Sequence, residues 1–179
     1  MKRFVRVMDG LRSNAGGFEY KLDEVNISNH WDPTTLDPEK QGGFNFCSED
    51  KILRWLHRGD TIYDVIIPDD AEVIEVDKDK GIFRSNKIIV TNPRKLTNKL
   101  IIDLYEKNTL SDKILAQSLQ VLLWKDKMDI VKYIIEDKVN ESNVEEILTE
   151  FGNYSCDKDF SYDKLGKKSK EVYDLLKSK

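Results

Sequence analysis

The residues best suited to bind a metal are two cysteines and two histidines, Cys47, Cys156, His30 and His57. Structural zinc sites pair their ligands at short spacing along the chain. No two of these four residues have such a spacing, and the two cysteines lie far apart. We therefore expect neither a metal site nor a disulfide framework, and free thiols indicate a reducing compartment.

Cys47 is the one candidate for nucleophilic chemistry. It directly precedes a predicted helix, whose dipole would lower the pKa of the thiol. Glu49 and Asp50 place negative charge beside the thiol, which opposes that effect, and no neighbouring residue supplies a base. We expect Cys47 to be a small buried apolar side chain.

A run of carboxylates follows in the middle of the chain, and a turn plus the exposed face of a strand accounts for it without catalysis. Several glycines occur in the first half, but none has the spacing of a phosphate-binding loop. We assign no catalytic residue. The carboxylates are Asp69, Asp70, Glu72 and Glu75, and the glycines are Gly10, Gly16, Gly17, Gly42 and Gly43.

The elements that must position these residues differ between the two halves. In the first half, β-forming residues predict strands over 4–8, 18–22, 43–47, 61–67, 72–76 and 87–90, with 61–67 and 72–76 as a hairpin. Residues 13–17 and 28–42 predict loops, and the second loop is long enough to indicate function. The strand at 43–47 runs into a helix that Ser48 is expected to cap and Gly59 to end.

From Thr91 onward the apolar residues recur at helical spacing. Asn92-Pro93 is expected to open the first helix, and apolar stripes predict further helices near 111–123, 128–135, 144–151 and 172–176. Residues 152–162 predict a polar interruption. The predicted fold class is α+β, with a mixed sheet and one short helix in domain 1–90 and a helical domain or extension in 91–179.

Composition excludes several classes of protein. The chain has 179 residues, of which 39% are apolar and 35% charged, so it has enough apolar side chains for a core. Its net charge is −4, and neither half carries the basic surplus that nucleic-acid binding needs. No apolar run has the length of a signal peptide or a membrane span. We expect no nucleic acid and no membrane as partners, and a cytoplasmic location.

Two segments carry resemblances. Residues 127–136, Lys-Met-Asp-Ile-Val-Lys-Tyr-Ile-Ile-Glu, with Ala116–Leu123 before them, resemble the helix pair of one ankyrin repeat. The stretch from Gly42-Gly43-Phe44-Asn45-Phe46-Cys47 to Ile66-Ile67-Pro68-Asp69-Asp70 resembles an uncharacterised family encoded by bacteriophages, large DNA viruses and some bacteria. That resemblance covers about residues 4–150. It implies a viral or phage-type accessory protein in the host cytoplasm.

The first half is also similar to the ADP-ribosyltransferase scaffold, in which an early strand leads to a turn and a Gly-aromatic strand runs into a helix. Val7-Met8-Asp9-Gly10 and Gly43-Phe44-Asn45-Phe46-Cys47-Ser48 stand for these elements. Met8 or Asp9 lies where that family grips NAD, and Glu72 and Glu75 are nearest to its catalytic glutamate. The resemblance implies NAD as the cofactor of a domain that binds it or transfers its ADP-ribose.

Three functions follow as hypotheses. The first is a protein-interaction module that contacts a host or partner protein. The second is the NAD-binding or transferring domain, which would make the chain an enzyme, and the third is a binder of another nucleotide or small ligand. The sequence leaves the oligomeric state open. Any ligand site is expected between the first strand and the strand at 43–48, walled by the long loop and lined by Arg6, Asp9, His30, Trp31, Asn45, Ser48 and Glu72.

Overall fold

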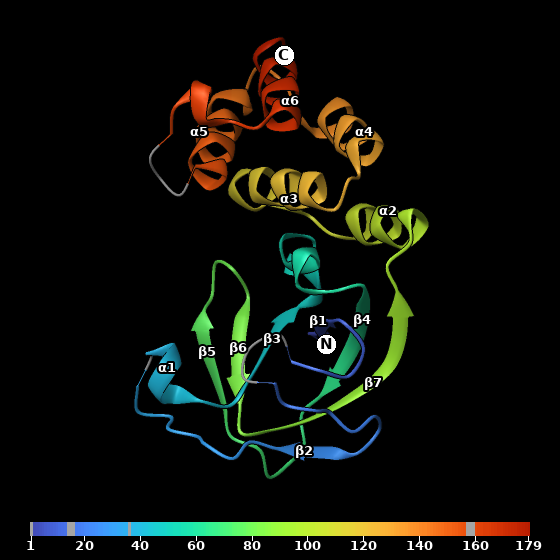
Figure 1. Ribbon diagram of the computed structural model, residues 1–179, viewed down its shortest axis with the longest axis vertical. Helices are drawn as coiled ribbons and strands as arrows, with labels where there is room; N and C mark the ends of the chain where they lie inside the picture. Colours follow the sequence, from blue (N-terminus) through green and yellow to red (C-terminus); the bar gives the residue numbers. More distant parts are fainter. Residues whose placement is uncertain (1, 14–16, 36, 157–159) are drawn as a thin grey trace. The chain divides into compact units, whose positions relative to one another are not determined.

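The computed structural model describes residues 2–13, 17–35, 37–156 and 160–179. Contacts divide the chain into two units. One unit comprises residues 1–52 and 58–97, and the other comprises residues 53–57 and 98–179. The first contains the strands and the second the long helices, so the α+β class is confirmed. The two units are drawn together in Figure 1 and are described one at a time below.

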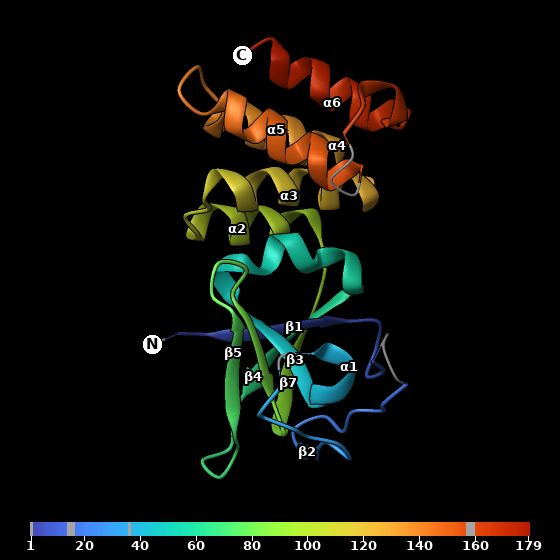
Figure 2. The same cartoon turned by 90° about the vertical axis from the view of Figure 1, so that its left-hand side faces the viewer.

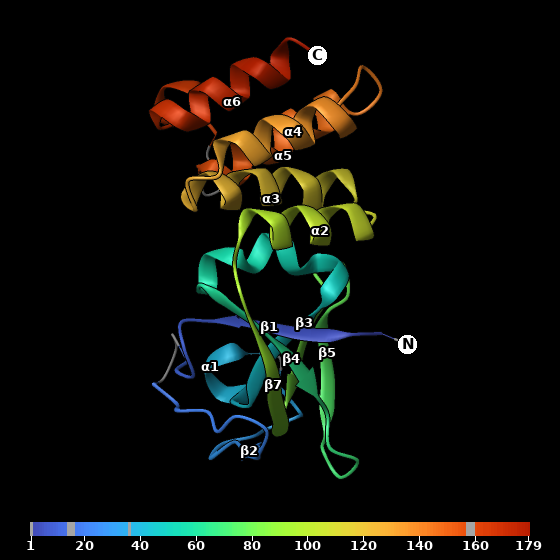
Figure 3. The same ribbon diagram turned by 90° about the vertical axis from the view of Figure 1, so that its right-hand side faces the viewer.

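The first unit is built on a seven-stranded sheet with the order β2-β7-β4-β1-β3-β6-β5. All strand pairs are antiparallel, so the expected mixed sheet is wrong in this respect. Figures 2 and 3 show β1 crossing the direction of β5 and β7, as expected of a strongly twisted sheet. The strands are β1 (Phe4–Met8), β2 (Val25–Ile27), β3 (Phe44–Ser48), β4 (Thr61–Ile66), β5 (Val73–Asp77), β6 (Ile82–Ser85) and β7 (Lys87–Lys95).

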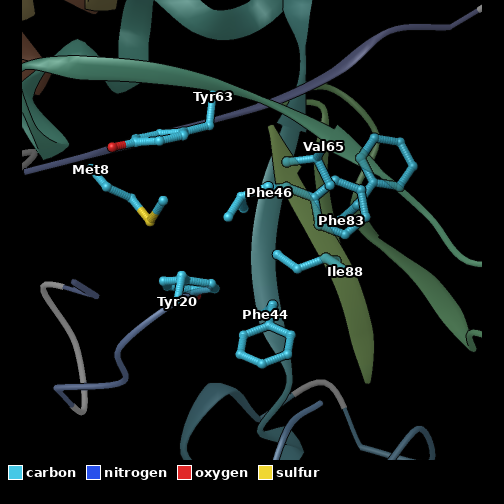
Figure 4. Packing of buried hydrophobic residues seen from close by; sticks show 9 residues of the cluster. Met8, Tyr20, Phe44, Phe46, Tyr63, Val65, Phe83 and Ile88 are labelled. Carbon is cyan, nitrogen blue, oxygen red and sulfur yellow. The ribbon is translucent and has the colours of Figure 1, made fainter. Parts of the chain in front are cut away.

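Both faces of this sheet carry buried side chains. Side chains of consecutive residues in a strand point to opposite faces, and consecutive residues of β1 and β3 are buried. One face carries an aromatic cluster that includes Phe44, Phe46 and Phe83. Figure 4 shows Met8, Tyr20 and Tyr63 grouped to one side of these rings. The opposite face carries residues such as Val5, Val7 and Cys47, which are also buried. Cys47 is therefore the buried strand residue that its sequence context predicted.

Two strand assignments from the sequence are wrong. The expected hairpin of 61–67 with 72–76 does not form, because β4 lies between β1 and β7 while β5 pairs with β6. Residues 18–22 make only isolated bridges, through Glu19 and Leu22, in place of a strand. Asp23 follows with a φ of 59°, which ends the extended run.

The helix expected at Asn92-Pro93 is also wrong, since β7 continues to Lys95. Asp64 pairs with Thr91 and Ile62 with Arg94, so one residue of β4 faces two of β7. This β-bulge accommodates Pro93, which has no N–H for a regular ladder. Strand β4 also forms the charged centre of the sheet surface, where Asp64 accepts hydrogen bonds from Arg3 at 2.7 Å and Arg94 at 2.6 Å.

Two short helices complete this part of the chain. The long loop contains the four-residue helix α1 (Pro38–Gln41), which Asp37 caps by accepting from the Glu39 amide at 3.1 Å. Residues Glu49–Arg58 follow β3 directly and form a 3₁₀ helix, η1. The strand-to-helix connection is as predicted, but Ser48 makes no side-chain cap and its amide bonds to the Gly81 carbonyl instead.

The second unit packs its helices around α3 (Figure 3). Ten consecutive residues of α3, 114–123, are buried, so this helix is covered on all sides. Its polar members are satisfied: Gln120 accepts from Ser155 at 2.7 Å and Ser169 at 3.2 Å. The helices are α2 (Asn98–Lys107), α3 (Asp112–Trp124), α4 (Met128–Lys138), α5 (Val144–Ser155), η2 (Tyr162–Lys164) and α6 (Lys167–Lys177).

The helical predictions for the second half are confirmed in type, with shifted ends. The first helix begins at Asn98, and α5 extends into the expected polar interruption as far as Ser155. Part of that interruption, residues 157–159, lies outside the described residues, as do residues 14–16 of the first predicted loop.

Candidate functional site

The candidate site lies where β1 and β3 stop pairing. Strand β1 pairs with β4 at five positions but with β3 at only two, Phe4 with Ser48 and Val5 with Cys47. Beyond these positions β3 pairs only with β6. The predicted neighbourhood of the first strand and the 43–47 strand is therefore present, and the hydrogen-bond ladder between them opens from Arg6 onward.

The Arg6 side chain fills this opening. Its Nη1 donates to the Asn45 backbone carbonyl, which lies on the side of β3 that β1 no longer pairs. Its Nη2 lies 3.4 Å from the Ser13 hydroxyl, and its guanidinium carbon lies 5.0 Å from the Tyr20 ring centroid. Among the described residues Arg6 forms no ion pair, and its buried Nε has no acceptor.

A second arginine lies on the other side of Asn45. Arg84, on β6, faces Asn45 in the strand register and donates from Nε to the Asn45 side-chain oxygen at 2.5 Å. Its Nη1 donates to the Gly42 carbonyl at 3.0 Å. Only 8% of Arg84 is exposed. Asn45 therefore accepts from both arginines, one through its backbone and one through its amide.

The electrostatics of this pair are unfavourable for two cations. Burial lowers the pKa of Arg6, partly offset by the Tyr20 phenol. Burial also lowers the pKa of Arg84, and the neighbouring charge of Arg6 lowers it further. Both guanidinium groups keep their protons at neutral pH, because arginine starts from a very high pKa. The site therefore holds positive charge that costs the fold free energy.

A continuous row of contacts runs from Arg6 to Glu72. Its successive members are Arg6, Asn45, Arg84, Gly42, Trp31 and Glu72. The Trp31 indole N–H donates to the Glu72 carboxylate at 2.8 Å, and Trp31 forms a bridge with Gly42. Gly43 has a φ of +73°, and a Cβ added there would lie 2.6 Å from the Trp31 ring. The close approach that glycine permits thus links Trp31 to the strand whose next residues include Asn45.

Of the seven residues expected to line a site, four belong to this row and His30 lies beside it. Arg6 and Asn45 are at one end, Trp31 and Glu72 at the other, and the His30 carbonyl accepts from the Gly43 amide at 2.9 Å. The His30 ring itself bonds through Nε2 to the Lys40 carbonyl.

Asp9 and Ser48 are placed elsewhere. Asp9 lies past the end of β1 and makes an isolated bridge to Arg12. Ser48 lies at the far end of β3 beside Gly81 and is buried. Strand direction carries both residues away from the row.

Arg84 is the residue that sequence reasoning missed. The segment 82–85, Ile-Phe-Arg-Ser, is only four residues long and directly follows a turn, so no strand was expected there. Its role depends on the pairing of β6 with β3, which places Arg84 opposite a residue 39 positions earlier. Only a prediction of that long-range register would have found it.

No helix among the described residues has both the length and the apolar character needed to cross a membrane. Neither cysteine forms a disulfide within the described part of the chain, and no described group of three His, Cys, Asp or Glu side chains is arranged to hold a metal ion.

Known proteins give no further guide to this site. No family model, curated protein or solved structure matches the chain. Its function must therefore be argued from the arginine pair and its surroundings.

Proposed function

We propose that the first unit binds a nucleotide that carries a pyrophosphate, with NAD as the ligand to test first. The observation that supports this is Arg6, a guanidinium without an ion pair in the described structure, placed where two strands part. An unpaired arginine beside a second arginine is costly for the fold, and an anionic ligand would offset that cost.

Guanidinium groups suit phosphate because their N–H donors match phosphate oxygens in pairs. The Nη2 of Arg6 lies 3.4 Å from Ser13, so this nitrogen has donor capacity for a ligand, whereas the Nε is buried without an acceptor. Arg84 adds positive charge from the other side of Asn45. A ligand with two adjacent phosphates would be attracted by the charge of both arginines and would contact Arg6.

The choice of NAD among such ligands rests on the resemblance to the ADP-ribosyltransferase scaffold. The row of contacts also offers the aromatic ring of Trp31, on which a nucleotide ring can stack. The two glutamates nearest to a catalytic position already have partners. Glu72 accepts from Trp31, and Glu75 pairs with Lys2 at 3.4 Å. We therefore propose binding without transfer.

Isothermal titration with NAD tests this proposal, with Arg6→Gln as the variant and Arg3→Gln as the matched control. Arg3 already pairs with Asp64, so a ligand does not need it. Loss of a charge-assisted contact worth about 1.5–3 kcal/mol should weaken NAD binding by about tenfold to a hundredfold in R6Q and little in R3Q. Absence of NAD binding, or equal weakening in both variants, would refute the proposal.

Two further titrations separate the parts of the ligand. ADP-ribose should bind and nicotinamide riboside should not, because only the former carries the pyrophosphate. Incubation with NAD labelled in its adenylate part, together with cell lysate and an active transferase as positive control, should leave no covalent label on protein. A labelled band dependent on this chain would show that it is an enzyme.

A second candidate function is recognition of a partner protein by the helical unit, in which α3 and α4 resemble one ankyrin repeat. Its exposed aromatic side chains favour this, since Trp124 is 54% exposed and Tyr133 43%. In affinity capture from host lysate, a partner retained by the wild-type chain should be lost with Trp124→Ser. It should be kept with Ile27→Ser, which removes an equally exposed apolar residue from the other unit. Identical retention by both variants would contradict this function.

A further inference from the structure

The helical unit contains a cavity of about 410 Å³ that the proposed nucleotide site does not use. Its walls come from α2, the α2–α3 connection, the start of α3, the end of α4 and the residue before α5. This volume falls within the range of ligand sites in proteins. All of its lining residues belong to the helical unit.

One wall of the cavity is aromatic. Tyr105 and Tyr133 meet edge to face with ring centroids 6.0 Å apart. Tyr105 is buried, and its hydroxyl donates to Asp137 at 2.6 Å. Tyr133 is exposed, and its hydroxyl donates to Glu106 at 3.0 Å. These two hydrogen bonds orient both rings, and each turns one carboxylate oxygen of the acid toward a tyrosine.

The charges around the cavity are unbalanced. Three carboxylates, Glu106, Asp112 and Asp137, line it together with one cation, Lys138. Lys138 pairs with Asp137 at 3.1 Å. Within the described residues Glu106 and Asp112 form no ion pair, and each accepts a hydrogen bond from a neutral side chain, Tyr133 and Asn143 respectively. The lining of the cavity therefore carries a net negative charge beside an exposed ring.

We propose that this cavity receives an arginine side chain from a basic segment of a partner protein. A planar guanidinium can stack on the exposed Tyr133 ring while its N–H groups donate to the carboxylates of Glu106 and Asp112. A lysine ammonium would satisfy the charge, but it has no planar surface to stack on the ring and no fixed pair of coplanar donors for the two carboxylates. The proposal rests on the second candidate function, partner recognition, and names the chemistry of that partner.

The test uses the full chain and three acetylated peptides of alternating glycine with arginine, lysine or glutamate. Binding is followed at low ionic strength by ¹H–¹⁵N correlation spectra. The arginine peptide should shift the amides of residues around 105–112 and 133–138 and bind more tightly than the lysine peptide, whereas the glutamate peptide should not bind. Addition of salt should weaken the binding, because the contacts are ionic.

Variants then separate the cavity from general attraction to an acidic chain. Glu106→Gln and Tyr133→Leu should each weaken binding of the arginine peptide by about fivefold to tenfold. Asp129→Asn is the matched control, since it removes the same charge from an exposed position at the other end of α4 and should change affinity less than about twofold.

Three results would overturn the proposal: equal affinity for the arginine and lysine peptides, amide shifts confined to other surfaces, or equal weakening in E106Q and D129N. Each of these concerns the cavity alone. A partner captured through Trp124 and unaffected by Glu106→Gln would leave partner recognition standing while rejecting the cavity as its site.

Discussion

Replacement of Arg6 by methionine should leave the stability of the first unit nearly unchanged while it removes nucleotide binding. Methionine is uncharged and unbranched and reaches about as far as the arginine Nε, so it enters the space beside Tyr20 without a clash. The substitution removes the hydrogen bond to the Asn45 carbonyl, worth about 1 kcal/mol, and the contact with the Tyr20 ring, worth about 0.5–1 kcal/mol.

The same substitution also removes a desolvated charge. Burial lowers the pKa of Arg6, which means that the ionised form is less favourable in the folded than in the unfolded chain. For a basic group this costs stability at every pH at which arginine is ionised, and the cost disappears with the charge. A fully buried ion costs several kcal/mol, and Arg6 is half-buried, so we expect a gain of about 1–2 kcal/mol. The net change should be within about 1 kcal/mol of zero.

Urea unfolding followed by circular dichroism measures this change, and Phe46→Ala provides the comparison. Phe46 is 4% exposed and contacts the rings of Phe4 and Phe83, so its truncation should cost about 3–5 kcal/mol. If R6M lost more than about 2 kcal/mol, Arg6 would be a structural residue. The inference that it is retained for a ligand would then be refuted.

Two further substitutions test the surroundings of the site. Gly43→Ala should destabilise the fold by about 2 kcal/mol and alter tryptophan fluorescence, because it combines a positive φ with a clash against Trp31. Gly10→Ala is the control, since Gly10 has a φ of +59° but no atom lies within 4 Å of the added Cβ. It should cost only about 1 kcal/mol. An equal loss in both would show that the Trp31 contact is unimportant. Asp64→Asn should cost about 1 kcal/mol of stability at neutral pH. Burial raises the pKa of Asp64, but the hydrogen bonds and charges of Arg3, Arg94 and Asn92 outweigh burial, so the pKa is lowered overall. The ionised Asp64 therefore stabilises the folded chain at pH values above its unfolded pKa of about 3.9. The difference in unfolding free energy between wild type and variant, measured in urea, should disappear as the pH falls below about 4. A difference that is constant with pH would contradict this.

The sequence by itself determined the parts of this protein that depend on neighbours along the chain. The helices of the second half follow from apolar residues at helical spacing, such as Ile130, Ile134 and Ile135, whose burial needs only one side of each helix to be covered. The strand at 43–47 that runs into a helix follows from its alternation and from the acidic first turn after it. The local pattern was sufficient in these places because the spacing of apolar residues along the chain matches the repeat of a helix or a strand.

The tertiary structure alone decided which strands pair and therefore which residues meet. The local sequence does not indicate that β4 and β5 are unpaired, that a bulge keeps Pro93 within β7, or that Arg84 faces Asn45. Each of these depends on a register between segments tens of residues apart, which is chosen by packing of the aromatic cluster over the whole sheet. The arginine pair exists for the same reason, because strand pairing brings together two cations that the sequence keeps 78 positions apart.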